Sequence, residues 1–168
     1  MTYPSDFSFE ELTVEDVLPL RTRVLRPHFV PGRMAHFLED RLPITCHFGI
    51  VDSQGEVLAV ATFFKHDSPV HPGMPALKLR GMAVDPGHQG LGLGTRMLDS
   101  ALVRLALRFP ECAIIWCYAR VAVTHFYERS GFSIWGEEII LGEIGPHFIM
   151  WRPMPELVVE DVYPAQLT

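Results

Sequence analysis

Three glycines at alternate positions stand where a helix is expected to begin. Gly90, Gly92 and Gly94 belong to the segment DPGHQGLGLGTRML, residues 85 to 98, which follows the apolar run 77–84. Glycine loses more conformational freedom on folding than any other residue and packs no side chain. Three of them together therefore indicate either a very tight turn or a ligand that lies against bare backbone. A glycine-rich turn from strand to helix presents N–H groups at the positive end of the helix dipole, which favours an anion such as phosphate.

Two well-known nucleotide-binding motifs fit this segment poorly. The Walker motif, GxxxxGK[ST], needs a lysine, and no lysine follows these glycines. The Rossmann fingerprint, GxGxxG, needs its third glycine at the position where this chain has Thr95. A Rossmann unit would also normally begin the fold, whereas this segment lies in the middle of the chain.

The periodicity of apolar residues and the positions of Gly and Pro predict the elements that hold these glycines in place. In chain order they begin with a helix over 16–26 that contains Pro19, a second short helix over 34–41, and a hairpin of 44–52 and 56–65 around the turn 53–55. A strand over 76–84, a helix over 95–108 and a buried strand over 112–119 follow. The last elements are a short helix over 121–131 with Gly131 as its cap, and an antiparallel pair at 132–141 and 147–154. This order predicts an α+β fold in which helices cover a mixed sheet. The tail after Pro153 is compatible with either an edge strand or loose chain.

Composition and charge narrow the class of protein. The chain has 168 residues, of which 48% are hydrophobic and 20% charged, as expected for one globular domain. Its net charge of −6 disfavours nucleic acid and anionic membranes as partners, and suits a cationic partner such as an amine. No signal peptide and no apolar run long enough for a membrane span is evident, so we expect a cytoplasmic protein. Cys46, Cys112 and Cys117 lack metal-binding spacing, and we expect buried thiols and no metal site.

Two motifs together resemble one family. Residues 89–94, QGLGLG, resemble the Q/R-x-x-G-x-G/A signature of the GNAT (Gcn5-related) N-acetyltransferases, and the preceding Val84-Asp85-Pro86 resembles the V-x-P of that family. Residues 126–132, FYERSGF, resemble its late F-Y-x-x-x-G-F segment. The resemblance extends from about residue 9 to 154 and implies a single domain over 1–168 with an uncertain tail at 155–168. It implies a mostly antiparallel sheet of six to seven strands, flanked by about four helices and splayed between its fourth and fifth strands.

The resemblance implies acetyl-CoA as co-substrate. Its pyrophosphate would rest on the glycine-rich turn, because a Cβ atom there would hold the phosphate oxygens away from the amides. The backbone of Met82, Ala83 and Val84 would pair with the pantetheine arm and polarise the thioester carbonyl. The residues implied to bind the co-substrate are Met82, Ala83, Val84, Gln89, Gly90, Gly92, Gly94, Thr95 and Phe126.

The resemblance also implies transfer of the acetyl group to a small-molecule amine by direct attack in a ternary complex. Tyr127 is the implied general acid for the leaving thiolate, with an aromatic packed beneath the sheet as the alternative. Glu137, Glu138 and His147 are the candidate bases, because the closing hairpin is expected to bring them to the acceptor side. For the two carboxylates the alternative is an exposed strand residue.

The sequence also predicts the surroundings of several other residues. Tyr118 stands where many relatives have Asn, so a contact from that position to pantetheine is not expected. We expect Trp116, Trp135 and Trp151 to pack in the core, and His66 and His71 to lie in a solvated loop. Arg21, Arg23 and Arg26 indicate a charged, solvated helix face, with a contact to a substrate carboxylate as the alternative.

The sequence is also compatible with two other functions. A non-catalytic acyl-CoA-binding or regulatory module would keep the glycine turn and lose the chemistry. A protein acetyltransferase acting on an N-terminus or a lysine would keep both. A homodimer is compatible with the sequence.

Overall fold

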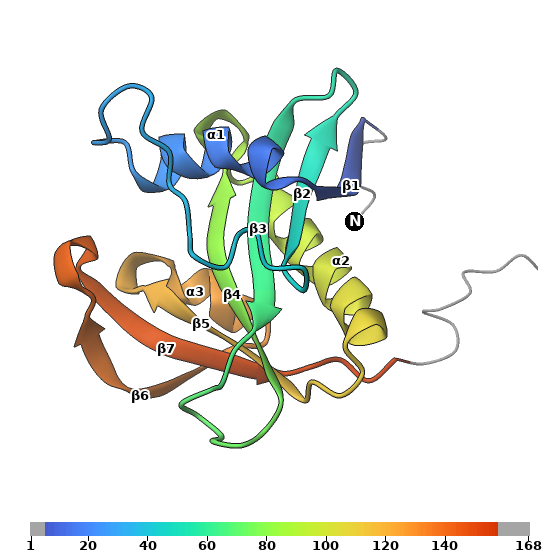
Figure 1. Ribbon diagram of the computed structural model, residues 1–168, viewed down its shortest axis with the longest axis vertical. Helices are drawn as coiled ribbons and strands as arrows, with labels where there is room; N and C mark the ends of the chain where they lie inside the picture. Colours follow the sequence, from blue (N-terminus) through green and yellow to red (C-terminus); the bar gives the residue numbers. More distant parts are fainter. Residues whose placement is uncertain (1–5, 158–168) are drawn as a thin grey trace, which may run out of the picture. The chain divides into compact units, whose positions relative to one another are not determined.

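The computed structural model describes residues 6–157 and has an α+β fold (Figure 1). Its strands are β1 (Phe7–Leu12), β2 (Cys46–Asp52), β3 (Val57–Lys65), β4 (Ala76–Val84), β5 (Ile114–Arg120), β6 (Ser133–Ile140) and β7 (Pro146–Pro153). Its helices are α1 (Val14–Leu25), α2 (Leu93–Arg108) and α3 (Thr124–Arg129), with 3-10 turns η1 (Pro86–His88), η2 (Val121–Val123) and η3 (Gly142–Ile144). The strand order β1-β2-β3-β4-β5-β7-β6 gives one seven-stranded sheet, in agreement with the six to seven strands that the resemblance implies. Over the part of the chain described, there are three α-helices rather than about four.

The chain forms two compact units. The first consists of the residues up to 65 together with 78–98, and the second of 66–77 together with the chain from 99 onward. Strands β1 to β3 pair antiparallel in the first unit. In the second unit, β7 pairs antiparallel with both β5 and β6. Each unit supplies different predicted functional residues, so each is described separately.

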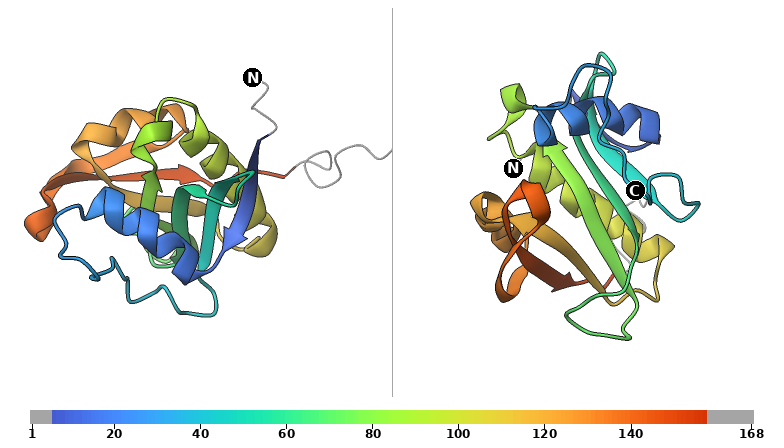
Figure 2. Two further views of the ribbon diagram at one scale, coloured as in Figure 1. Left: turned by 90° about the horizontal axis from the view of Figure 1, so that it is seen from above. Right: turned by 60° about the vertical axis from the view of Figure 1, so that its left-hand side comes forward.

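The first unit has helices on both faces of its strands (Figure 2). Helix α1 begins with a capping box, in which Thr13 and Asp16 bond each other's backbone N–H groups. Its apolar side packs Val17 and Leu20 against Val60 of β3 and Ala83 of β4. Pro19 lies within α1, as predicted.

Two predictions for the first unit need correction. Strand β1 was not among the predicted elements; its half-buried residues alternate with exposed ones along a short acidic edge strand. The predicted helix over 34–41 is wrong, since this segment has only turns. Side chains take the hydrogen bonds a helix would use: Asp40 accepts the N–H of Phe37 at 2.8 Å, and Thr22 accepts that of Ala35 at 2.9 Å.

The second unit is built around β5, whose residues are almost all buried. Trp116 is 1% exposed and packs with Val70, Ala76 and Ile149, while Trp151 packs against the same cluster. Trp135 of β6 is 41% exposed, so the expectation that it packs in the core is wrong. Strand β6 lies at the edge of the sheet, and its side chains have little to cover them.

The loop 66–75 also differs from expectation. His71 stacks edge-on against Trp151 with ring centroids 4.7 Å apart, and His66 does the same against Trp116 at 5.6 Å. Ser68 and Val70 are buried. The difference is partial: the middle of the loop packs on the second unit, whereas six of its ten residues, including His66, are exposed, as expected of a solvated loop.

The three cysteines are free thiols and all are buried. Within residues 6–157 no helix has the length and apolar character needed to cross a membrane. Nor does that part of the chain hold a group of three His, Cys, Asp or Glu side chains able to bind a metal ion.

Candidate active site

The glycine-rich turn lies between β4 and α2 in the first unit. Asp85 ends β4 and caps η1, where its carboxylate accepts the N–H of Gly87 at 3.0 Å and a bond from His88 Nδ1 at 2.8 Å. Arg23 of α1 forms an ion pair with the same carboxylate. The bond from His88, followed by that from Gly87 and the charge of Arg23, lowers the pKa of Asp85 below its usual range. These contacts fix the entrance to the turn.

The glycines themselves have two different roles. Gly90 and Gly92 have φ angles of +79° and +77°, a left-handed conformation that L-residues rarely adopt. A Cβ atom built on Gly90 would have nothing within 4 Å. Gly94 is already part of α2 and has no positive φ. The first two glycines are thus required by the backbone conformation of the turn, which is one of the two explanations that the sequence offered.

Helix α2 begins with amides that point toward this turn. The N–H of Arg96 bonds to the carbonyl of Gly92 at 3.0 Å, which is the first bond of the helical pattern. The amides of Leu93, Gly94 and Thr95 precede it, and the first amides of a helix have no acceptor within the helix. Left-handed glycines followed by a helix N-terminus form a concave set of N–H groups suited to an anion. The backbone at Gly90, Gly92, Gly94 and Thr95 is therefore suited to an anion such as a pyrophosphate.

The neighbouring predicted residues hold this turn on the end of the sheet. Ala83 is 5% exposed and faces α1, while Met82 and Val84 are half-buried on the opposite side of β4. The side-chain amide of Gln89 donates to the Val84 carbonyl at 3.3 Å. Gln89 therefore closes the turn back onto β4.

In the second unit, Tyr127 lies in an aromatic cluster. Its ring contacts Phe126 and Phe132 with centroids 5.1 and 5.3 Å away. The side chain is only 7% exposed, and burial raises the pKa of the phenol well above its usual value. The hydroxyl therefore stays protonated at neutral pH. The close packing of the ring is also what is expected of the alternative, in which Tyr127 is an aromatic residue with a structural role.

His147 is buried at the start of β7, with 4% of its surface exposed. Its Nδ1 lies 2.9 Å from the carbonyl oxygen of Gly145. Because a carbonyl can only accept, Nδ1 carries the proton in the neutral ring and Nε2 keeps its lone pair. A neutral imidazole in this tautomer has the electronic form of a base.

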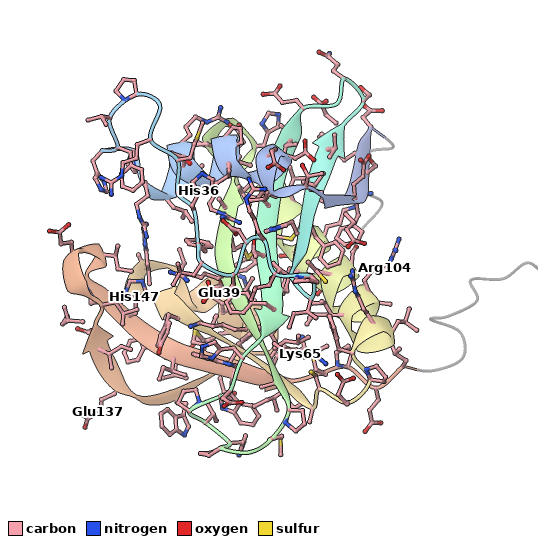
Figure 3. The ribbon with its side chains drawn as sticks, in the orientation of Figure 1. His36, Glu39, Lys65, Arg104, Glu137 and His147 are labelled. Atoms are coloured by element: carbon pink, nitrogen blue, oxygen red, sulfur yellow. The ribbon has the colours of Figure 1, made fainter. Side chains whose placement is uncertain are left out.

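Glu137 and Glu138 lie on the edge strand β6. Both are exposed residues of β6, inside the register shift between Trp135 and Ile139. Residue 139, not 137 or 138, is the partner of His147 in the strand pair. Glu137 points outward from β6 and away from His147 (Figure 3). The structure therefore directs the Glu137 carboxylate away from His147.

Arg21 corrects the expectation of a solvated face on α1. Its side chain is fully buried and forms an ion pair with Asp40, with Nη1 to Oδ2 at 2.9 Å. It also donates to the carbonyl of Ala35 and to Thr62 Oγ1, and lies 4.3 Å from the ring centre of Phe37. Burial lowers the pKa of Arg21, which the bond and charge of Asp40 oppose.

His47 completes this buried polar network. Its Nε2 lies 3.0 Å from the Asp40 carbonyl and its Nδ1 lies 2.8 Å from Thr62 Oγ1. The carbonyl requires the proton on Nε2. In the neutral ring Nδ1 is then an acceptor and takes the hydrogen bond from the Thr62 hydroxyl. Burial, with the charge of Arg21 as a further cause, lowers the pKa of His47 below its ordinary value of 6.5.

Known proteins resemble this chain in sequence and in fold. The model of the acetyltransferase (GNAT) family matches residues 14–132. The chain belongs to the GNAT acetyltransferase family. This GNAT protein is 29% identical over 143 residues to the uncharacterized N-acetyltransferase YitI of Bacillus subtilis (strain 168), covering 85% of this chain and 93% of YitI.

Two solved structures share the fold of this GNAT acetyltransferase. Escherichia coli ElaA has a TM-score of 0.70 at 19% identity, covering 87% of this chain and 99% of that one. A point mutant of the spermidine N-acetyltransferase SpeG from Vibrio cholerae has a TM-score of 0.63 at 16% identity, covering 89% of this chain and 95% of that one. At these identities the likeness concerns the fold.

Sequence reasoning missed the buried polar residues Asp40, His47 and Thr62. One signal could have found part of the network. Arg21 follows Val14, Val17 and Leu18 at helical spacing, so it occupies the apolar side of α1. A charged residue at such a position requires a buried partner.

Proposed function

We propose that this GNAT protein transfers the acetyl group of acetyl-CoA to a primary amine of a small molecule, which attacks directly while both substrates are bound. The observation that supports this most is the turn 85–95, in which two left-handed glycines precede the N-terminus of a helix. The similarity in fold to a protein named spermidine N-acetyltransferase supports a small-molecule amine as acceptor.

In this proposal the turn holds the pyrophosphate on its backbone N–H groups. Acetyl-CoA, when bound, supplies an acyl carbonyl and a thiolate leaving group. Backbone N–H groups of Met82–Val84 would stabilise the carbonyl oxygen as it gains charge, and one such donor contributes about 3 kcal/mol to catalysis.

Tyr127 and His147 would manage the protons. The raised pKa of Tyr127 makes full ionisation costly, so its hydroxyl is better suited to donate a hydrogen bond to the departing thiolate than to ionise fully. His147, with its Nε2 lone pair, is the better candidate base, since Glu137 and Glu138 are exposed on the edge strand.

A matched pair of glycine variants tests the turn. Gly90 and Gly55 have φ angles of +79° and +83°, and at each a Cβ would meet nothing within 4 Å. Alanine at either position carries the same backbone cost, about 1–2 kcal/mol. We expect Gly90→Ala to weaken acetyl-CoA binding about tenfold or more, the cost of spoiling one charge-assisted hydrogen bond. Gly55→Ala should leave affinity unchanged, as measured by calorimetry, and equal losses in both variants would refute the assignment.

Turnover then separates an enzyme from a non-catalytic binding module. CoA release should be followed over a panel of small amines, peptides with free N-termini and peptides containing lysine. Release with small amines alone supports the proposal, and release with peptides alone replaces it with a protein acetyltransferase. Binding of acetyl-CoA with no release in any arm supports the module instead.

The proton-transfer roles have their own readouts. Positioned acid–base groups contribute roughly 10²–10⁴ in rate. Tyr127→Phe should therefore lower kcat with little change in acetyl-CoA affinity. His147→Gln should remove the low-pH limb of kcat/KM, and Glu137→Gln should retain it. A His147→Gln enzyme that keeps both rate and limb would exclude His147 as the base.

A further inference from the structure

Three side chains form a row across the second unit, where strands β5, β7 and β6 lie side by side (Figure 1). Ile149 of β7 is paired in register with Tyr118 of β5 on one side and with Trp135 of β6 on the other. Residues directly opposite each other in antiparallel strands point to the same face of a sheet. These three residues, which we call the aromatic row, therefore stand next to one another with the isoleucine between two aromatic side chains.

The two aromatic side chains of this row are exposed, although the isoleucine between them is buried. Tyr118 is 37% exposed and Trp135 is 41% exposed. Their backbones are two strand spacings apart, which is about 9–10 Å. A flat ring placed midway between them would lie within the range of about 4.5–7 Å that aromatic contacts have. The spacing therefore suits an aromatic group that lies over Ile149.

The packing of the loop 66–75 explains why this row is exposed and the next one is not. Trp116 and Trp151 form the next row on the same face, and they are paired in register. His66 contacts the ring of Trp116, His71 contacts that of Trp151, and Val70 packs with Trp116. The loop thus packs on the row of the two tryptophans and leaves both rings of the aromatic row in contact with solvent.

His147 lies in the row on the other side. It is paired in register with Arg120 of β5 and with Ile139 of β6. It is two residues from Ile149 on the same strand, which places the two rows about 7 Å apart. His147 is the base of the proposed function, so the amine that it deprotonates must come within hydrogen-bond reach of its ring. The carbon skeleton attached to that amine then extends over neighbouring side chains, and the aromatic row adjoins His147 with exposed apolar surface.

The charges at these two rows favour an aromatic group over a polyamine. None of the residues in the aromatic row or in the row of His147 is acidic. Glu137 of β6 points away from His147 (Figure 3). A second ammonium group in the acceptor would therefore find no carboxylate in either row, whereas the rings of Tyr118 and Trp135 offer contacts to an aromatic group.

We propose that the aromatic row binds the body of the acceptor, so that the amine acetylated is one joined to an aromatic ring by a short chain. The proposal rests on the proposed function, with His147 as the base, and names the substrate class of that site. Aromatic rings form offset or edge-to-face contacts with one another, and Tyr and Trp supply large contact area at a low cost in rotamer freedom. Tyr118 and Trp135 are therefore specificity-determining residues.

The test compares three primary amines of similar length by CoA release: phenylethylamine, hexylamine and hexanediamine. We expect the wild type to have its highest kcat/KM with phenylethylamine. Tyr118→Leu and Trp135→Leu retain apolar bulk and lose the ring. Each should lower the preference for phenylethylamine over hexylamine roughly threefold to tenfold, as for loss of one aromatic contact. Tyr118→Phe and Trp135→Phe retain a ring at each position and should keep the preference.

Ile134→Ala is the matched control. Ile134 precedes Trp135 on β6 and is equally exposed, but it points to the opposite face because successive residues of a strand alternate. This variant should keep the preference for phenylethylamine. Preference of the wild type for hexanediamine, or equal losses of preference in Trp135→Leu and Ile134→Ala, would overturn the proposal. Acetylation of peptides with an aromatic N-terminal residue, but not of phenylethylamine, would also overturn it, in favour of a protein substrate.

Failure of the proposed function would give a different result from failure of this inference. If no amine is acetylated, calorimetry with phenylethylamine and with hexylamine still tests the aromatic row directly. Tighter binding of phenylethylamine that Trp135→Leu weakens and Ile134→Ala retains supports the row as the binding site. A wild-type protein that does not bind phenylethylamine, or binds hexylamine equally well, overturns it.

Discussion

Arg21 and Arg23 lie two residues apart on α1, yet their surroundings differ in every respect. Arg21 is fully buried and bonds to Asp40, Thr62 and the carbonyl of Ala35. The Arg23 side chain is 57% exposed and pairs with Asp85 at the edge of the glycine turn. Two residues on a helix are about 200° apart, so one side chain faces the sheet and the other solvent.

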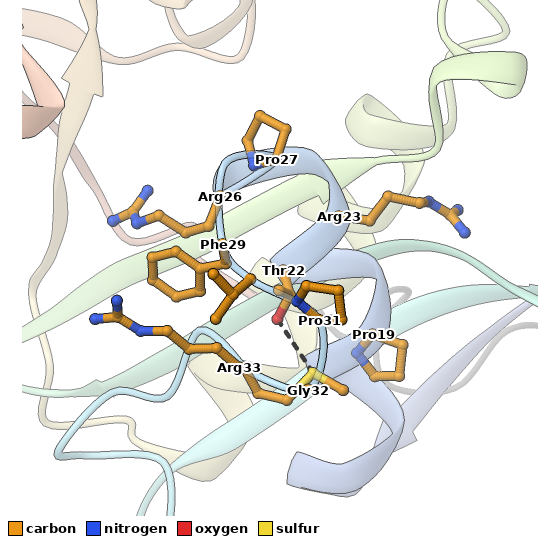
Figure 4. A pocket seen from close by; sticks show the side chains of 11 residues that line it. Pro19, Thr22, Arg23, Arg26, Pro27, Phe29, Pro31, Gly32 and Arg33 are labelled. Carbon is orange, nitrogen blue, oxygen red and sulfur yellow. Dashed lines mark hydrogen bonds between the residues drawn. The ribbon is translucent and has the colours of Figure 1, made fainter.

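The comparison shows that being an arginine does not determine what a residue does in the fold. The buried guanidinium organises the segment 34–45, because Asp40 also accepts the backbone N–H of Phe37 and its carbonyl holds His47. Its Nε is buried without a hydrogen-bond partner among the described residues, although the Phe37 ring lies against the group. Arg26 and Arg33, by contrast, line a cavity beside their own segment (Figure 4).

Removing Asp40 should have the largest effect on stability. Asp40→Ala leaves Arg21 charged and buried without its carboxylate, which typically costs about 3–5 kcal/mol. The free energy of unfolding from urea denaturation measures it. If the variant fails to fold, the double variant Arg21→Met/Asp40→Leu should regain stability, because an apolar pair leaves no buried charge. Continued instability of the double variant would mean that the pair is not the cause.

A methyl group at Gly81 should disturb the same network from the side of β4. Its φ is +66°, and a Cβ there would lie 2.6 Å from Phe37 Cε2 and 2.9 Å from Arg21 Nε. We expect Gly81→Ala to lower stability by about 1–3 kcal/mol from overpacking, in addition to the backbone cost. Gly55→Ala isolates the backbone cost, since nothing surrounds that position. Equal losses of stability in Gly81→Ala and Gly55→Ala would show that the network accommodates the added methyl group without loss of stability.

His47 makes the buried network sensitive to pH. Its pKa is lowered in the folded protein, so below about pH 6.5 the unfolded chain takes up a proton that the folded chain does not. Stability should therefore be constant above pH 6.5 on this account and fall as the pH decreases through the folded pKa. In urea titrations from pH 7.5 to 5, His47→Gln should flatten this fall, whereas the exposed His36→Gln should not. The same slope in wild type and His47→Gln would assign the effect elsewhere.

Breaking the exposed pair should have the smallest effect. Arg23→Met removes an ion pair with one half-exposed partner, and such pairs contribute no more than about 1 kcal/mol. The loss should also shrink at high salt, which screens exposed charges. A stability loss as large as that of Asp40→Ala would abolish the distinction between the two arginines.

The elements that hold the glycine turn could be predicted from the sequence because their signals are local. The strand 76–84 has the bounds predicted for it, and α2 starts two residues before the expected Thr95. An apolar run, a glycine cluster and an amphipathic stretch follow one another there. Over 34–41 the same reasoning failed, because the bonds that decide the backbone come from Thr22 and Asp40 rather than from neighbours in a helix.

The features of the candidate site likewise fall into those that the sequence predicts and those that only the tertiary structure shows. The sequence by itself determined the family, the α+β fold and the turn with Gly90 and Gly92, since motif and hydrophobic period are properties of contiguous residues. Only the tertiary structure decided that Arg21 is buried and that Glu137 is exposed. It also decided that Arg26 and Arg33 flank one ring. Burial and pairing depend on residues that are distant along the chain, and the pattern of one segment does not contain them.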